Sequence, residues 1–138
     1  AGDLAGLADS RTSADRALRV LRAGVVRGRR VASLADVQVE ALVLELRDLA
    51  AARGDRPSGP IAKLFAYDEE HDTSLVPTLR AWLDSFGDVN AAAAAVYVHP
   101  NTFRYRLRRL SEVGGLDLTD PEARFAAMVQ LRVVSPAR

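Results

Sequence analysis

Apolar residues recur at intervals of three and four positions along most of this 138-residue chain, and that spacing restricts its fold more than any other feature. Residues spaced in this way share one face of an α-helix. Glycine and proline interrupt the pattern, most densely in residues 54–60, which makes this segment a candidate linker. We therefore predict a mainly α protein, a helical bundle with room for one short strand at residues 31–34.

The N-terminal half predicts two helices. The N-cap of the first would be Ser10, Thr12 or Ser13. Its arginines would form a solvated side, and its buried face is expected to contain Ala14, Ala17, Leu18, Leu21 and Val25. The second helix is expected to begin near Ser33 and Asp36. Its buried stripe is expected to contain Val39, Leu42, Val43, Leu46, Leu49 and Ala50.

The C-terminal half predicts further helices. A short apolar segment at 61–65 leads into an acidic turn, and the next helix would be capped by Thr73 or Ser74. The expected core face of that helix contains Leu75, Leu79, Trp82, Leu83 and Phe86. A slim alanine-rich helix follows at 90–96, then a turn, "YVH", and a helix that starts at Pro100 and stops at Gly114–Gly115. Asp120 would cap the last helix.

The stretch "HPNTFRYRLRRL", residues 99–110, combines an apolar face with a cationic one. Phe103, Leu107 and Leu110 fall within about 60° of one another on a helix, so they would face the core. Four arginines and no carboxylate lie between Val89 and Ser111. The outward side therefore suits a polyanion with hydrogen-bonding edges, because arginine can pair with guanine or with phosphate and asparagine can read adenine.

The preceding residues favour a helix-turn-helix. Alanines at 92, 93 and 95 would allow two helix backbones to approach closely, and Val96 and Val98 would fill the space at the turn. In this motif the second helix enters the major groove of DNA. A glycine often occupies the turn, where this chain has Tyr97.

Residues 90–132, "NAAAAAVYVHPNTFRYRLRRLSEVGGLDLTDPEARFAAMVQLR", closely resemble the C-terminal DNA-binding domain of PucR-type bacterial transcriptional regulators, which include purine-catabolism and sugar-diacid regulators. The resemblance rests on the Val-His-x-Asn-Thr-x-Arg-Tyr-Arg-Leu-x-Arg pattern at 98–109 and on the Gly-Leu-Asp-Leu and Asp-Pro-Glu segments that follow. It implies that residues 59–138 are the helix-turn-helix domain. Residues 1–58 would be the mostly helical end of a preceding GGDEF-like regulatory region.

We therefore expect sequence-specific binding of duplex DNA, with a recognition helix at 100–111 in the major groove, and no catalysis. The expected DNA-binding residues are Asn90, His99, Asn101, Thr102, Arg104, Tyr105, Arg108 and Arg109. We expect a cytoplasmic homodimer that needs no cofactor or metal and has no membrane contact, and whose small-molecule effector binds to regions outside this chain. The absence of cysteine excludes disulfides and thiolate metal sites.

Two other classes of function compete with DNA binding. A protein-interaction or dimerisation module would use residues 46–50 or the terminal helix, and it would show an exposed apolar patch. A metal-dependent enzyme could be built on the cluster Asp68, Glu69, Glu70, His71 and Asp72. These residues are consecutive in an expected turn, where side chains diverge, so a solvated turn is the favoured interpretation of the cluster.

Overall fold

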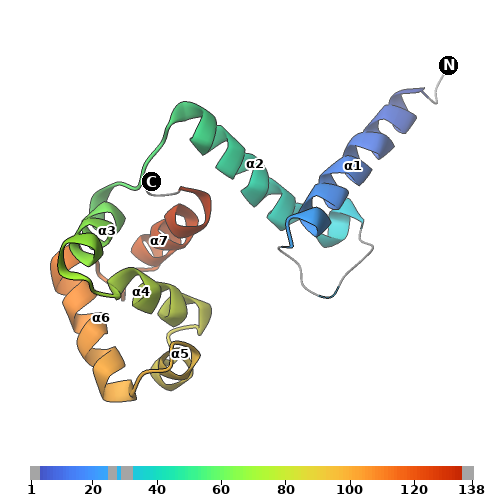
Figure 1. Cartoon of the computed structure of the whole chain (residues 1–138). Helices are drawn as coiled ribbons and strands as arrows, with labels where there is room; N and C mark the ends of the chain where they lie inside the picture. The colour runs from blue at the N-terminus through green and yellow to red at the C-terminus, as the bar shows by residue number, and fades with distance from the viewer. Residues whose placement is uncertain (1–3, 25–27, 29–32, 135–138) are drawn as a thin grey trace. The chain divides into compact units, whose positions relative to one another are not determined.

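A computed structural model describes residues 4–24, 28 and 33–134 of the chain. Every regular element in these residues is a helix, and no strand occurs among them, which confirms the mainly α class. Val31 and Ala32 of the expected strand lie outside the described residues, and Leu34–Asp36 form a 3₁₀-helix, η1. The chain divides into two compact units, residues 1–52 and 53–138 (Figure 1).

The first unit consists of α1 (Leu4–Arg22), η1 and α2 (Gln38–Arg53). Its small core contains Ala17, Val20, Val37, Ala41 and Leu44, with Leu34 packed against them. Two ion pairs join α1 to α2. Arg16 donates to both carboxylate oxygens of Glu45, at 2.5 and 3.0 Å, and Arg19 lies 2.7 Å from Asp48. Arg16 and Arg19, which were expected on a solvated side, therefore help to hold the two helices together, whereas Arg22 is exposed as expected.

The predicted start of the first helix was wrong, and its predicted buried face was right only in part. Helix α1 begins at Leu4, so Ser10, Thr12 and Ser13 lie inside it, and the Thr12 hydroxyl donates to the Ala8 carbonyl. Leucine and alanine at positions 4–8 favour helix, which explains the earlier start. Ala17 is buried as predicted and Leu21 is half-buried, whereas Ala14 and Leu18 are exposed and the buried Val20 was not predicted. Val25 lies outside the described residues.

The predicted face of α2 was right only in part. Ala50 is buried as predicted and Val43 is half-buried. Ala41 and Leu44 are buried against α1, whereas most of the expected stripe is exposed: Val39, Leu42, Leu46 and Leu49. Helix α2 carries apolar residues on two sides, so periodicity alone did not distinguish them. The acidic partners of Arg16 and Arg19 are on α2, and these ion pairs accompany the packing of the narrower Ala41–Leu44 side against α1. The expected cap at Ser33 and Asp36 belongs to η1, where a capping box forms.

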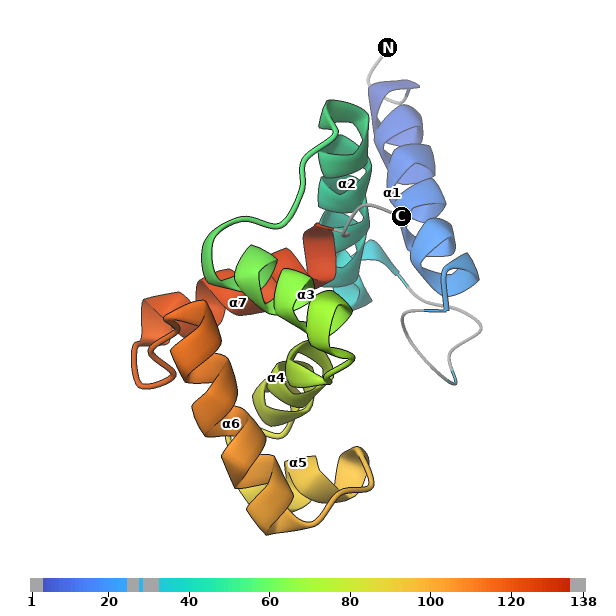
Figure 2. The same cartoon turned by 60° about the vertical axis from the view of Figure 1, so that its left-hand side comes forward.

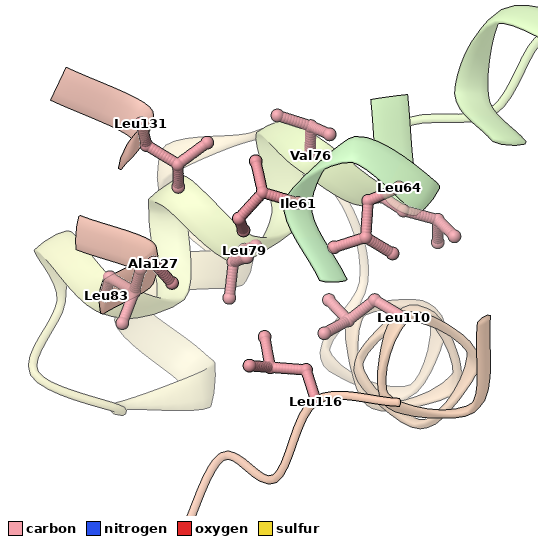
Figure 3. Packing of buried hydrophobic residues seen from close by; sticks show 10 residues of the cluster. Ile61, Leu64, Val76, Leu79, Leu83, Leu110, Leu116, Ala127 and Leu131 are labelled. Atoms are coloured by element: carbon pink, nitrogen blue, oxygen red, sulfur yellow. The ribbon is translucent and has the colours of Figure 1, made fainter. Parts of the chain in front are cut away.

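The second unit contains α3 (Gly59–His71), α4 (Leu75–Asp84), α5 (Val89–Ala95), α6 (Pro100–Gly114) and α7 (Pro121–Val133). Helices α3 and α4 pack on α6, and α7 packs on the α3–α4 pair (Figures 1 and 2). Figure 3 shows side chains from these helices meeting in one core, which includes Ile61, Leu64, Leu79, Leu110 and Leu131. A second cluster of Ala81, Ala92, Ala93 and Phe103 joins α4, α5 and α6.

The acidic segment before α4 is helical rather than a turn, because α3 continues to His71. Asp68 on that helix reaches forward to the start of α4. Its carboxylate accepts the backbone N–H groups of Leu75 and Val76 at 2.7 and 2.8 Å. Asp68 thus performs the capping role that we expected of Thr73 or Ser74, whose side chains make no such bond.

Phe86 was expected in the core and is instead fully exposed. Helix α4 ends at Asp84, so Phe86 lies beyond the helical face and has a left-handed backbone with φ of 54°. The other members of the face behave as predicted, since Leu75, Leu79 and Leu83 are buried and Trp82 is partly buried between the two clusters. Gly87 follows with φ of 79°, and a Cβ there would lie 3.2 Å from the Trp82 ring.

Candidate nucleic-acid interface

Helix α5 is short and lies directly against its neighbours. Asp88 caps it by accepting the N–H groups of Asn90 and Ala91 at 2.9 and 3.0 Å. Ala92 and Ala93 are fully buried, which confirms that alanine permits the close approach of this helix. Ala95 was expected to share that role and is exposed. Asn90 is exposed in the first turn of the helix.

The turn after α5 is tight and closed by backbone hydrogen bonds. The Val98 N–H donates to the Ala93 carbonyl at 3.0 Å, and the Tyr97 N–H donates to the Ala94 carbonyl at 3.2 Å. This is the Schellman arrangement, which requires a left-handed residue, and Tyr97 supplies it with φ of 56°. Val96 and Val98 pack against the cluster around Phe103, as predicted. The turn therefore holds α6 in a defined orientation to α5.

Both ends of α6 are fixed as the sequence predicted. The Nδ1 atom of His99 accepts the Asn101 N–H at 3.1 Å, and Pro100 occupies the first helical position. Gly115 ends the helix with φ of 65°. Phe103 and Leu110 are fully buried, and Leu107 is partly buried. One side of α6 is thus anchored in the core, which leaves the other side available to a partner.

The exposed side of α6 carries hydrogen-bond donors and positive charge. Asn101, Thr102, Arg104, Tyr105 and Arg108 are all exposed there. Arg104 donates to the Asn101 Oδ1 atom at 3.0 Å, which leaves the two N–H bonds of that amide directed to other acceptors. Arg108 makes no ion pair or hydrogen bond with the described residues. A guanidinium without a protein partner is well suited to bind a base or a phosphate.

Arg109 differs from Arg104 and Arg108 because the protein itself holds its side chain. Its guanidinium donates to the Tyr67 hydroxyl at 2.9 and 3.3 Å and to Glu112 at 3.3 Å, and it lies 5.2 Å from the Tyr67 ring centre. The hydrogen bond to Tyr67, followed by that to Glu112, raises the pKa of Arg109. Arg109 therefore presents a positioned charge next to the exposed face, and Tyr67 is a support that sequence reasoning missed.

Arg106 lies on the flank of α6 toward α3 and the start of α4. It is half-buried, in keeping with its expected place at the edge of the core. Together with Thr102, Tyr105 and Arg109 it borders a hollow of about 280 Å³ whose opposite wall includes Thr73 and Ser74. The exposed face of α6 is thus continuous with a groove bordered by hydroxyl groups, guanidinium groups and the carboxylate of Asp72.

Two residues of the alternative metal cluster, Asp68 and His71, have partners outside it. Asp68 caps α4 and also accepts the Thr73 hydroxyl at 2.5 Å. The His71 ring stacks on the Tyr67 ring with 4.1 Å between centres. Within residues 4–24 and 33–134, no three acidic, histidine or cysteine side chains converge as a metal site would require.

None of the helices in residues 4–24 and 33–134 has the length and apolar character needed to cross a membrane.

All eight residues expected to bind DNA lie on α5, on α6 or at the cap between them. Seven of them lie on α6 or at its N-cap; six of these seven are exposed and Arg109 is half-buried. Asn90 lies at the start of α5. Asp88 was missed as the cap of α5, although an aspartate before an alanine-rich run is a recognisable signal. Tyr67 was missed because its partner Arg109 is distant in the sequence, and Asp68 was missed because it was expected in a turn rather than on α3.

Residues 75–133 match the family model of the PucR C-terminal helix-turn-helix domain. The chain is 30% identical over 73 residues to the "DNA-binding transcriptional activator AdeR" of Bacillus subtilis (strain 168), an alignment that covers 53% of this chain and 17% of that protein. It is 34% identical over 87 residues to the "Carbohydrate diacid regulator" of Escherichia coli (strain K12), an alignment that covers 62% of this chain and 23% of that protein.

A third relative is the "Purine catabolism regulatory protein" of Bacillus subtilis (strain 168), 35% identical over 69 residues, which are 50% of this chain and 13% of that protein. The matched residues therefore span less than a quarter of the length of each of these three relatives. No solved structure is a significant match.

Proposed function

Because residues 75–133 are a PucR C-terminal helix-turn-helix domain, we propose that this chain is the C-terminal part of a bacterial transcriptional regulator that binds specific duplex DNA sequences. The observation that carries the proposal is the surface of α6. Its buried side is anchored by Phe103 and Leu110, while its opposite side carries exposed arginine, asparagine and hydroxyl groups without a carboxylate before Glu112. Such a helix fits the major groove, where base edges and phosphates both accept hydrogen bonds.

Within this proposal the contacts divide by position on α6. Arg108 and Arg104 would pair with base edges or phosphates, and the Asn101 amide, already bound by Arg104, would donate to an acceptor such as a guanine edge. The hydroxyl groups of Thr102 and Tyr105 would donate hydrogen bonds to phosphate oxygens of the DNA backbone. Three expected residues remain: Asn90, His99 and Arg109. They would contact phosphates, or add positive charge, at the border of the DNA major groove. No catalytic step is assigned to any of these residues.

A single recognition helix reads only a few base pairs, so specific binding favours a homodimer with half-sites about one DNA turn apart. We place this dimer in the bacterial cytoplasm and place the binding of a small-molecule effector outside this chain. Residues 1–58 would be the end of a GGDEF-like regulatory region, as the resemblance implies.

The first unit offers a surface for self-association. Val39, Leu42, Leu46 and Leu49 are 45–68% exposed and follow the three–four–three spacing of a coiled-coil seam on α2. If this seam forms the dimer, Leu42→Glu with Leu46→Glu should yield monomers in sedimentation equilibrium. Ala51→Glu, on another exposed part of α2, is the matched control and should leave the dimer intact. A dimer unchanged by the leucine substitutions would place the contact elsewhere.

The DNA-binding proposal is tested by selecting duplexes from a random library and measuring the affinity of variants for the selected and the scrambled sequence. Arg108→Ala should weaken binding to the selected duplex by roughly 1–3 kcal/mol if Arg108 reads a base. Arg124→Ala, on α7, is the control and should bind as wild type does. Failure to select any sequence, together with weak binding that is independent of salt, would contradict the proposal.

A further inference from the structure

We propose that the hydroxyl of Tyr97, in the turn between α5 and α6, donates a hydrogen bond to a backbone phosphate at the edge of the major groove. This inference rests on the proposed DNA binding and adds a residue that neither the sequence pattern nor the family resemblance assigned to the interface. Three observations carry it: the strain of the backbone at Tyr97, the exposure of its side chain, and its position next to the start of α6.

Tyr97 occupies a backbone conformation that disfavours a side chain. Its φ is 56°, and it stands at the left-handed position of the Schellman turn that closes α5. Glycine is preferred there because a Cβ introduces steric strain in this region. The protein nevertheless places a bulky aromatic residue at this position. The stability of the turn therefore gives no reason for a tyrosine.

Packing gives no reason for a tyrosine either. The side chain is 96% exposed, and its hydroxyl has no hydrogen-bond partner in the described part of the chain. Its neighbours Val96 and Val98 supply the apolar contacts of the turn with the Phe103 cluster. Neither the turn nor the core therefore uses the Tyr97 side chain, and its hydroxyl is available to a partner outside the protein.

The position of the turn identifies the chemistry of that partner. Tyr97 precedes His99, the N-cap of α6, by two residues. When the first turns of α6 lie in the major groove, the residues just before the helix lie at the border of the groove, where the sugar-phosphate backbone runs. No carboxylate lies between Val89 and Ser111, so the turn does not repel phosphate. A phenolic O–H is among the groups that bind phosphate oxygens in protein–DNA complexes.

Phe86 provides a matched control within the same unit. It also stands at the left-handed position after a helix, with φ of 54°, and is 100% exposed. It precedes the N-cap of α5, Asp88, by two residues, as Tyr97 precedes His99. Phe86 has no hydroxyl group, so it has the same strain and exposure without the chemistry required for a phosphate contact.

The experiment compares Tyr97→Phe, Tyr97→Gly and Phe86→Gly in thermal unfolding and in binding to a selected duplex across a series of salt concentrations. Both glycine variants should be at least as stable as wild type, because they relieve left-handed strain. Tyr97→Phe and Tyr97→Gly should each weaken DNA binding by about 2- to 10-fold, the usual range for one hydrogen bond. Phe86→Gly should bind as wild type does.

The slope of affinity against salt should be unchanged in Tyr97→Phe, because a neutral phenol releases no counterion. Wild-type affinity in Tyr97→Phe would overturn the inference, and so would an equal loss in Phe86→Gly. A wild-type chain that selects no DNA sequence would instead refute the proposed function, and this result is distinguishable because it is measured before any variant is made.

Discussion

Replacing Asp68 by alanine should destabilise the second unit strongly, because this side chain joins α3 to the start of α4. Its carboxylate accepts the N–H groups of Leu75 and Val76 at 2.7 and 2.8 Å and the Thr73 hydroxyl at 2.5 Å. Loss of an N-cap costs about 0.5–2 kcal/mol, and hydrogen bonds to a charged acceptor contribute about 1.5–3 kcal/mol. Since these bonds share one carboxylate, we expect Asp68→Ala to cost about 2–3 kcal/mol in total.

The assay is urea and thermal unfolding followed by the fluorescence of Trp82. This residue is the only tryptophan in the chain and contacts the core of the second unit. A loss of 2–3 kcal/mol corresponds to a fall of about 10–20 °C in the Tm of a domain of this size. Thr73→Ala removes only the hydroxyl and should cost less than about 1 kcal/mol. A cost below about 0.5 kcal/mol for Asp68→Ala would refute the assignment of Asp68 as the cap.

Three further perturbations test the packing and one local carboxylate. Phe103→Ala should cost about 3–5 kcal/mol of unfolding free energy, because the ring is fully buried, and a cost under 1 kcal/mol in urea titration would contradict this. Ala93→Leu should cost about 1–3 kcal/mol by overpacking, whereas wild-type stability would argue against close approach of α5. Thr119→Val should raise the lowered pKa of Asp117 toward its ordinary value, because the Thr119 hydroxyl is the main cause of the shift. The free energy of stabilisation by Asp117 is present above its ordinary pKa and is lost as pH falls through the lowered pKa. An unchanged midpoint for the Asp117 carboxyl carbon of Thr119→Val in a carbon-13 titration would contradict this cause of the shift.

The helix-turn-helix was predictable from the sequence because its signals are local. The His99 cap, Pro100 at the first position and the glycines at the end of α6 are each adjacent to the structure they determine. The separation of Phe103 and Leu110 from the arginines follows directly from helical periodicity. The exposed face of α6 was therefore expected almost residue by residue.

The orientation of α2 was not predictable in this way. Apolar residues lie on two of its sides, and both sides satisfy the spacing expected of a buried stripe. The buried side contains Ala41 and Leu44, and ion pairs to residues of α1 almost thirty positions away accompany its packing. Which side of α2 is buried depends on contacts with residues distant in the sequence, so the apolar pattern of α2 alone does not reveal it.

The roles of Asp68 and Phe86 depended on where helices end. A difference of a few residues placed Asp68 on α3, within reach of α4, rather than in a turn. The end of α4 at Asp84 moved Phe86 from an expected core position to full exposure. Helix boundaries are set by cap contacts as well as by propensity, and the cap of α4 comes from another helix.

The entry of α6 into the major groove is the central claim, and methylation interference on a selected duplex tests it most directly. Methylation of guanine at N7 modifies the major groove, whereas methylation of adenine at N3 modifies the minor groove. We expect N7 methylation within each half-site to block binding by the wild-type chain, and Arg108→Ala to lose sensitivity at one guanine. Interference confined to adenine N3, or none at any guanine, would contradict the account.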